Sequence, residues 1–194
     1  MRRRTLDALL TAGGLALSAV LLVAGGLLLW GHSFVNSQVH TQLAAQQIFF
    51  PAAGSESLKD PEVGPYLNKY AGQQLVDGAQ AQAYADHFIG VHVKGIAGGQ
   101  TYAQLSAKAQ ANPDDPKLAG QVQTIFRGET LRGLLLNAYA FWKIGQIALY
   151  AAIVAFVGAG VFLLLSVLGF VHMRRVRPGM EVRLGAKAPA PVEP

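Results

Sequence analysis

The chain has 194 residues, of which 52% are hydrophobic and 14% charged, and it contains no cysteine. It is more apolar than an ordinary soluble domain, in which about a quarter of the residues are charged. The lack of cysteine excludes disulfides, thiol catalysis and thiolate metal sites. We therefore expect a membrane protein that is held together by packing alone.

Residues 8–30 are predicted to form the first transmembrane helix. The stretch from Ala8 to Trp30 carries no charge and exceeds the roughly 20 residues that a helix needs to cross a bilayer. A basic start precedes it, as in a signal peptide, but the apolar core of a signal peptide is only about 7 to 15 residues long. We therefore predict a retained anchor after a short N-terminal segment, residues 1–7.

The segment 31–143 is predicted to be a helical domain between two membrane spans. No long alternating pattern typical of strands is present, and Pro, Gly and Ser cluster at 51–65, where we expect a loop. Asp115 precedes Pro116 and is placed to cap the next helix. The spacing of apolar residues, together with Pro and Gly residues that end helices, predicts the helices before this cap. They are 33–50, an extension of the first span that ends at Pro51, a short helix at 66–75, a longer one at 78–96, and one at 101–111.

A single helix is predicted from residue 116 to residue 172, and its uncharged part, 144–172, is the second transmembrane helix. The remaining residues, 173–194, form a basic tail, and we expect disorder in its Ala- and Pro-rich end, residues 185–194. The predicted fold class is an all-α membrane protein, with two transmembrane helices and an extracytoplasmic helical bundle inserted between them.

The formal net charge of +5 lies entirely at the two ends of the chain. Eight basic and eight acidic residues cancel between the spans, while residues 1–7 carry +2 and residues 173–194 carry +3. Positive residues near membrane spans stay in the cytoplasm, so both termini are predicted inside and residues 31–143 outside the cell membrane. Basic residues in these positions face anionic lipid, so we predict no nucleic-acid partner despite the high pI.

Small residues on the second span predict a close helix contact. Ala151, Ala155 and Ala159 recur every four residues, a spacing at which two membrane helices approach closely. The simpler interpretation is packing against the first span, with Gly14 and Ser18 opposite. The alternative is a surface for a partner protein or a second copy.

Two histidines, His87 and His92, lie in the sequence HFIGVH and are weak candidates for a metal site together with His40. On a helix, positions five apart point in different directions, so His87 and His92 cannot bind one ion from a single face. The projection places His92 on the buried face and His87 at its edge. We therefore predict structural histidines and no metal site.

Charged residues on the apolar face of the last helix form a second candidate. The projected inward stripe consists of Leu118, Val122, Ile125, Leu136 and Ala140, and Glu129, Arg132 and Lys143 fall on or beside it. Buried charges are costly unless paired, so we expect Glu129 and Arg132, three residues apart, to form an ion pair. Lys143 with Trp142, and Trp30 on the first span, are typical of an interfacial belt.

The stretches YLNKYAGQQLVDGAQAQAYADHFIGVH (66–92) and GQVQTIFRGETLRGLLLNAYAFWKIGQIA (120–148) resemble a group of small two-span actinobacterial membrane proteins. Some members carry the label aromatic ring-opening dioxygenase, small subunit. That label implies a non-haem iron enzyme, whose iron is held by two histidines and one carboxylate. In the enzymes of that name the larger subunit holds the iron, so the resemblance implies no catalytic residue on this chain.

No phosphate-binding loop, nucleophile elbow or HExxH motif is present, and neither span has an ionisable residue at its centre. We therefore predict no catalytic residue and no cofactor, and we favour a non-enzymatic protein. The leading hypothesis is an external bundle that binds another membrane or envelope protein or a second copy. Ligand sensing through a separate partner is the first alternative, and a dioxygenase-like protein is the second.

Overall fold

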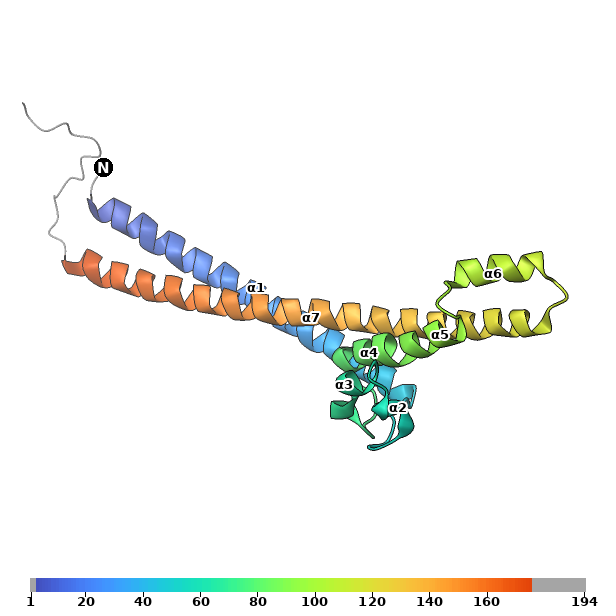
Figure 1. Cartoon of the computed structure of the whole chain (residues 1–194). Coiled ribbons are helices and arrows are strands. Elements are labelled where there is room, and N and C mark those ends of the chain that lie inside the picture. The colour runs from blue at the N-terminus through green and yellow to red at the C-terminus, as the bar shows by residue number, and fades with distance from the viewer. Residues whose placement is uncertain (1–2, 176–194) are drawn as a thin grey trace, which may run out of the picture. The chain divides into compact units, whose positions relative to one another are not determined.

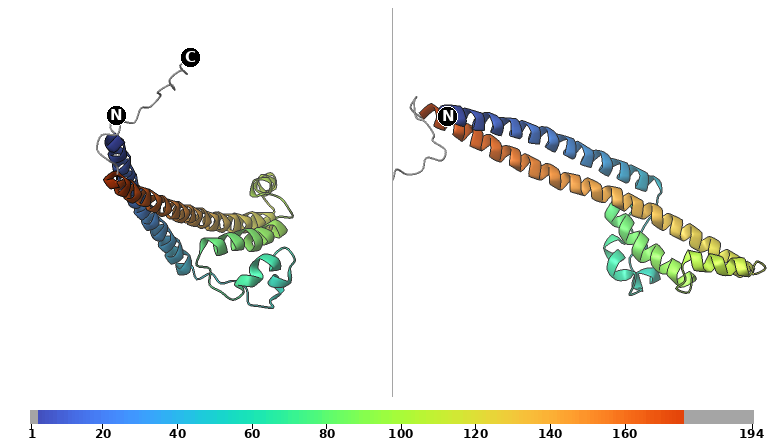
Figure 2. Two further views of the ribbon diagram at one scale, coloured as in Figure 1. Left: turned by 90° about the vertical axis from the view of Figure 1, so that its left-hand side faces the viewer. Right: turned by 90° about the horizontal axis from the view of Figure 1, so that it is seen from above.

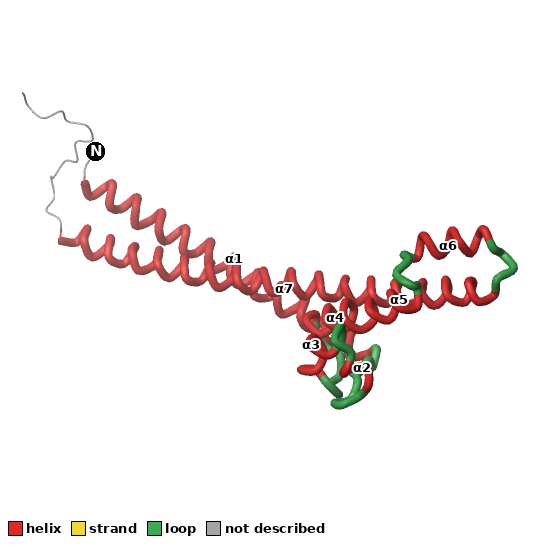
Figure 3. Tube along the Cα trace, in the orientation of Figure 1, coloured by secondary structure: helices red, strands yellow, loops and turns green. Residues whose placement is uncertain are grey.

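The computed structural model describes residues 3–175, and every regular element in this part of the chain is a helix. The predicted all-α class is thus confirmed for these residues, with a single isolated bridge between Phe49 and Gln74. Most of the predicted tail, 176–194, lies outside the described residues. The elements are α1 Arg3–Ala45, α2 Glu56–Lys59, α3 Gly64–Leu67, the 3-10 turn η1 Asn68–Tyr70, α4 Gly78–Tyr84, the π-helical turn η2 Ala85–Ile89, α5 Gly90–Ile96, α6 Tyr102–Ala111 and α7 Pro116–Arg175 (Figures 1 and 3).

Two of these helices, α1 and α7, are long and apolar enough to cross a membrane. In the most apolar 18-residue stretch of each, only 11% and 22% of the residues are buried. A helix in the core of a soluble domain with such a composition would be buried on most sides. The apolar side chains of α1 and α7 instead point away from the protein, as Leu10 and Val154 do.

The chain divides into two compact units, and the first consists of the described parts of Met1–Leu29 and Leu149–Pro194. Its two helical segments run antiparallel. A Cβ atom at Gly14 would lie 2.3 Å from Ser166 Oγ, and one at Gly169 would lie 2.7 Å from Thr11 Oγ1. A larger residue at either glycine would therefore require the Ser166 or Thr11 side chain to move, so these glycines allow the two helices to pack closely.

The alanine face predicted on the second span packs within this first unit. Ala155 and Ala159 are buried, as is Ala152, whereas Ala151 is only half-buried. Ser18 donates a hydrogen bond from its Oγ to the Ala159 carbonyl oxygen at 2.9 Å. The simpler of the two interpretations, packing against the first span, therefore accounts for this face.

The second unit, Trp30–Ala148, contains a separate hydrophobic core. The continuous helix made by α4, η2 and α5 lies alongside α7 (Figures 1 and 2), where Gly128 contacts Val93. Gly78 allows a similar approach to the Trp142 side chain. The largest fully buried side chains of the core are Leu67, Leu75, Ile125 and Val63.

The outer end of α1 differs from the prediction, because the helix ends at Ala45 and not at residue 50. Gln74 caps this end by donating from its side-chain amide to the Ala44 carbonyl oxygen at 2.8 Å. Gln47 adopts a left-handed conformation with φ of 52°, which turns the chain away from the helix axis. Phe50 is then buried in the core instead of continuing the helix.

The predicted loop at 51–65 and helix at 66–75 are also corrected. The loop contains the short helix α2, and the next helical segment begins at Gly64 and ends at Tyr70. Gly72, with φ of 71°, turns the chain after this segment. The following residues pair with the segment after α1 through a hydrogen bond from Leu75 N to the Ile48 carbonyl oxygen at 2.8 Å.

Local caps fix the starts of the remaining helices. Asp77 and Gln80 form a reciprocal capping box before α4, and Thr101 and Gln104 form one before α6. The predicted cap of α7 is present, since Asp115 Oδ1 accepts from the backbone N–H groups of residues 117 and 118 at 3.0 Å. These helix starts are encoded by local sequence.

Candidate functional site

The π-helical turn η2 determines which side chains of the 78–96 helix face the core. Buried residues along this helix recur every four positions: Ala81, Ala85, Ile89, Val93 and Ala97. A regular α-helix has 3.6 residues per turn, so a stripe with this spacing would drift around its axis. The wider π turn takes up part of the drift, and such turns are frequent at functional sites.

The turn η2 also explains why the prediction for His92 was wrong. His92 is exposed, and its Nδ1 lies 2.6 Å from the Phe88 carbonyl oxygen of the preceding turn. The adjacent residue, Val93, takes the buried position. His87 is half-buried, and its ring stacks on Tyr66 with 3.5 Å between the ring centroids.

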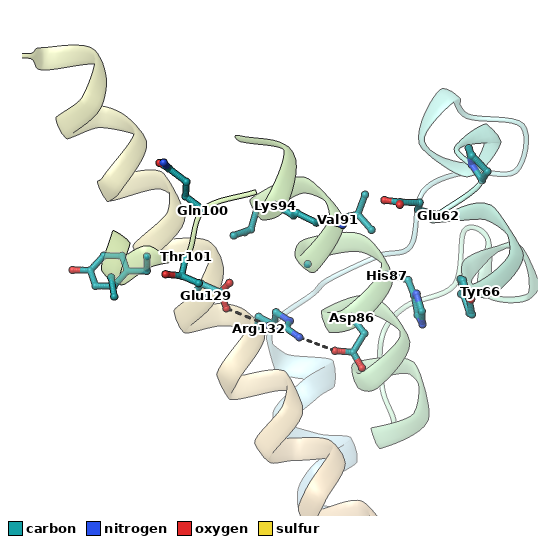
Figure 4. A pocket seen from close by; sticks show the side chains of 15 residues that line it. Glu62, Tyr66, Asp86, His87, Val91, Lys94, Gln100, Thr101, Glu129 and Arg132 are labelled. Atoms are coloured by element: carbon teal, nitrogen blue, oxygen red, sulfur yellow. Dashed lines mark hydrogen bonds and ion pairs between the residues drawn. The ribbon is translucent and has the colours of Figure 1, made fainter. Parts of the chain in front are cut away.

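Arg132 of α7 contacts two carboxylates, Asp86 of η2 and Glu129 of its own helix (Figure 4). Its Nη2 lies 3.2 Å from Asp86 Oδ1, and its Nη1 lies 3.4 Å from Glu129 Oε2, so the predicted Glu129–Arg132 pair is present. The side chains of Arg132 and Asp86 are 34% and 32% exposed. Asp86 was not predicted as a partner, because the sequence separates it from Arg132 by 46 positions.

These residues line an open polar cavity of about 910 Å³. Glu62, Asp86 and Glu129 supply negative charges, and Lys94 and Arg132 supply positive charges. The cavity therefore offers both charge signs, together with the Thr101 hydroxyl and the Tyr66–His87 stack. Polar and charged groups of this kind fix the orientation of a ligand in a pocket.

The three histidines considered as metal ligands are not brought together. His40 is exposed on α1, His92 is exposed on α5, and His87 stacks on Tyr66. Within residues 3–175, no group of three or more His, Asp or Glu side chains is arranged to hold a metal ion.

Tyr84, the residue directly before η2, has a phenol whose pKa is shifted by its surroundings. Burial between Phe50 and Phe88 raises the pKa of its phenol above the ordinary value. The side chain is therefore neutral at physiological pH and acts as an aromatic core residue.

Double-mutant cycles should give a coupling of about 1 kcal/mol for Asp86 and Arg132, because the pair is half-buried and joins two elements. The matched control is Glu56 and Lys59, whose side chains are 88% and 63% exposed, and there we expect less than about 0.5 kcal/mol. Alanine variants of the full chain would be compared by denaturant unfolding in mild detergent. Equal coupling in the two pairs would show that the Arg132 pair is only a surface contact.

The residues predicted to form an interfacial belt lie in different environments. Trp30 is exposed and stacks on Phe34 with 5.7 Å between centroids, and Lys143 is exposed as well. Trp142 is half-buried and packs against Gly78, so it belongs to the core of the second unit.

The inward stripe predicted on α7 is partly wrong. Leu118 and Ile125 are buried as expected, but Leu135 takes the buried position predicted for Leu136, and Ala140 is exposed. The projection assumed one partner for α7. The helix in fact packs against α5 on one side, at Gly128, and against α1 on another, where His32 Nδ1 lies 2.9 Å from the Gly145 carbonyl oxygen.

An open groove of about 660 Å³ lies between the outer part of α1 and α7 within the second unit. Leu134 and Phe141 are 61% and 60% exposed, and Phe34 is exposed on the α1 side. Sequence reasoning missed this groove. The sequence feature that indicates it is the run Leu134, Leu135, Leu136, which puts large apolar side chains on more than one face of α7. The complete lining is Phe34, Val35, Gln38, Val39, Gln42, Leu43, Gln46, Ile48, Leu131, Leu134, Leu135, Asn137, Ala138 and Phe141.

No family model, no curated protein and no solved structure matches the chain. The resemblance to two-span actinobacterial proteins, and the dioxygenase label with it, stays a prediction. The candidate sites are therefore judged on their geometry and chemistry.

Proposed function

We propose that this chain is a two-span integral membrane protein whose external helical domain binds another protein, either an envelope partner or a second copy. The groove between α1 and α7 is the observation that carries the proposal. Its exposed Leu134, Phe141 and Phe34 lie together on one surface. Contiguous exposed apolar surface is typical of interaction sites, and charged residues are depleted at the centres of protein interfaces.

The membrane part of the proposal is supported by the first unit. Large apolar side chains of its two helices, such as Leu10, Val20 and Val154, are exposed along their length. A bilayer would cover these side chains and remove the cost of exposing them to water. The positive ends of the chain support cytoplasmic termini and an external 31–143 segment. A cysteine at Ala103 that reacts with an impermeant maleimide only after cell lysis would contradict this orientation.

Site-specific photo-crosslinking in native membranes tests the protein interaction. A benzoyl-phenylalanine in place of Phe141 keeps an aromatic ring on the groove, and the same group at Lys143, exposed but outside the groove lining, is the control. We expect protein adducts from position 141 and few from position 143. Adducts to lipid alone at position 141, or equal protein adducts at both positions, would contradict the proposal.

Ligand sensing is a second candidate, and the polar cavity around Arg132 favours it. The cavity includes residues from the π turn, and both charge signs line it. A small zwitterionic or polyhydroxylated ligand that raises the thermal stability of the full chain, but not of an Asp86→Asn variant, would support this role. A panel of amino acids and sugars without any such effect would count against it.

A further inference from the structure

We infer that the groove binds a second copy of this chain, so that the outer parts of α1 and α7 from two copies form a four-helix arrangement. This inference rests on the proposed function, because it names the partner of the same groove. Two-helix units that leave one apolar groove open can bury it by pairing as a four-helix bundle. Three features favour a second copy as the partner: the groove lining carries no charge, amide side chains lie along it, and the predicted membrane spans adjoin it in sequence.

The absence of charge in the groove lining favours a symmetric partner. Around a two-fold axis, residues close to the axis face their own equivalents, so any charge there meets the same charge. The segment 31–143 contains eight basic and eight acidic residues, yet none of them lines the groove. Self-association therefore brings no like charges together at this surface.

Amide side chains along the groove favour a polypeptide over a lipid chain. Gln38 and Gln42 are exposed on α1, Gln46 is exposed directly after its last residue, and Asn137 is exposed on α7. An amide both donates and accepts hydrogen bonds, so it can pair with an identical amide of a second copy. An acyl chain offers no such partner and would leave the amides it covers unsatisfied.

The predicted membrane spans, which adjoin the groove in sequence, determine how two copies can meet. The α1 side begins at Phe34 and the α7 side ends at Phe141, so both sides directly adjoin the predicted spans in sequence. Two copies held in one bilayer by the same segments share their orientation and height, which requires the two-fold axis to run along the membrane normal. Leu134 and Phe141 of one copy then insert into the groove of the other, and the contact is reciprocal.

Cysteine crosslinking of the full chain in membranes tests this inference. The chain has no native cysteine, so Leu134→Cys introduces a unique thiol on the groove, and Ala140→Cys introduces one on an exposed face outside it. A bismaleimide with a spacer of about 10 Å spans a typical interhelical distance. We expect a product of twice the chain mass from Leu134→Cys, in at least roughly fivefold higher yield than from Ala140→Cys. Asn137→Cys repeats the test if Leu134→Cys lowers the yield of folded protein.

The possible outcomes separate this inference from the proposed function. Equal dimer yields at positions 134 and 140 would indicate random collisions and overturn the inference. No dimer from Leu134→Cys or Asn137→Cys, together with photo-adducts from position 141 to a different protein, would overturn the second copy but leave a protein interaction. No dimer and only lipid photo-adducts would overturn both.

Discussion

Leu135→Ala should lower the free energy of unfolding of the second unit by about 2–5 kcal/mol, whereas Leu134→Ala should lower it by less than about 1 kcal/mol. The two leucines are adjacent on α7, but Leu135 is 3% exposed and Leu134 is 61% exposed. Truncating Leu135 leaves a cavity in the core to which Val39 and Leu43 also belong, while truncating Leu134 removes a side chain that the single chain does not cover.

Denaturant unfolding of the full chain in mild detergent, followed by circular dichroism, measures this difference. The two variants remove the same atoms from neighbouring positions, so each serves as a control for the helix propensity of the other. The comparison must be made at a dilution at which the wild type is monomeric. Association would otherwise bury Leu134 between copies, and its truncation would then lower the stability as well. Similar losses from both variants would mean that α7 is rotated about its axis relative to the structure described above.

Leu134→Lys should weaken association between copies by roughly a hundredfold or more, because burying an unpaired charge costs several kcal/mol. Two-fold symmetry adds repulsion between the two new lysines. Ala140→Lys is the matched control, since Ala140 is exposed on the same helix but does not line the groove. Neither substitution should change the unfolding midpoint of the monomer by much, because surface substitutions usually cost little.

Energy transfer between labelled copies in lipid vesicles, measured as the chains are diluted with lipid, gives the association constant for each variant. We expect energy transfer between Ala140→Lys chains to fall with dilution as it does for the wild type. For Leu134→Lys it should disappear earlier in the dilution, at a much higher density of chains in the lipid. If both lysine variants associate as tightly as the wild type, the contact between copies lies elsewhere on the chain.

The helix pattern could be predicted well wherever local sequence determines it. Uncharged stretches identify α1 and α7, and Asp115 with Pro116 marks the start of α7. Glu129 and Arg132 lie one helical turn apart, so their pairing follows from spacing alone. Helix class, several boundaries and this ion pair therefore did not require knowledge of the tertiary structure.

Features that depend on contacts between distant residues were missed. The end of α1 at Ala45 depends on a hydrogen bond from Gln74, and the partner Asp86 reaches Arg132 from another helix. His92 was placed on the wrong face because a regular helical projection cannot anticipate the π turn at Ala85–Ile89. The groove was missed for a related reason, since it exists only where the outer part of α1 lies beside α7.

Counting the chains in each particle is the most direct test of the central claim, that an external groove makes this membrane protein associate with itself. Wild-type protein would be extracted from its native membrane in polymer-bounded lipid discs and counted by single-molecule photobleaching of a fluorophore on each chain. We predict two chains per disc for the wild type and for Ala140→Lys, and one chain for Leu134→Lys. One chain per disc for the wild type, at native density in the membrane, would contradict the claim.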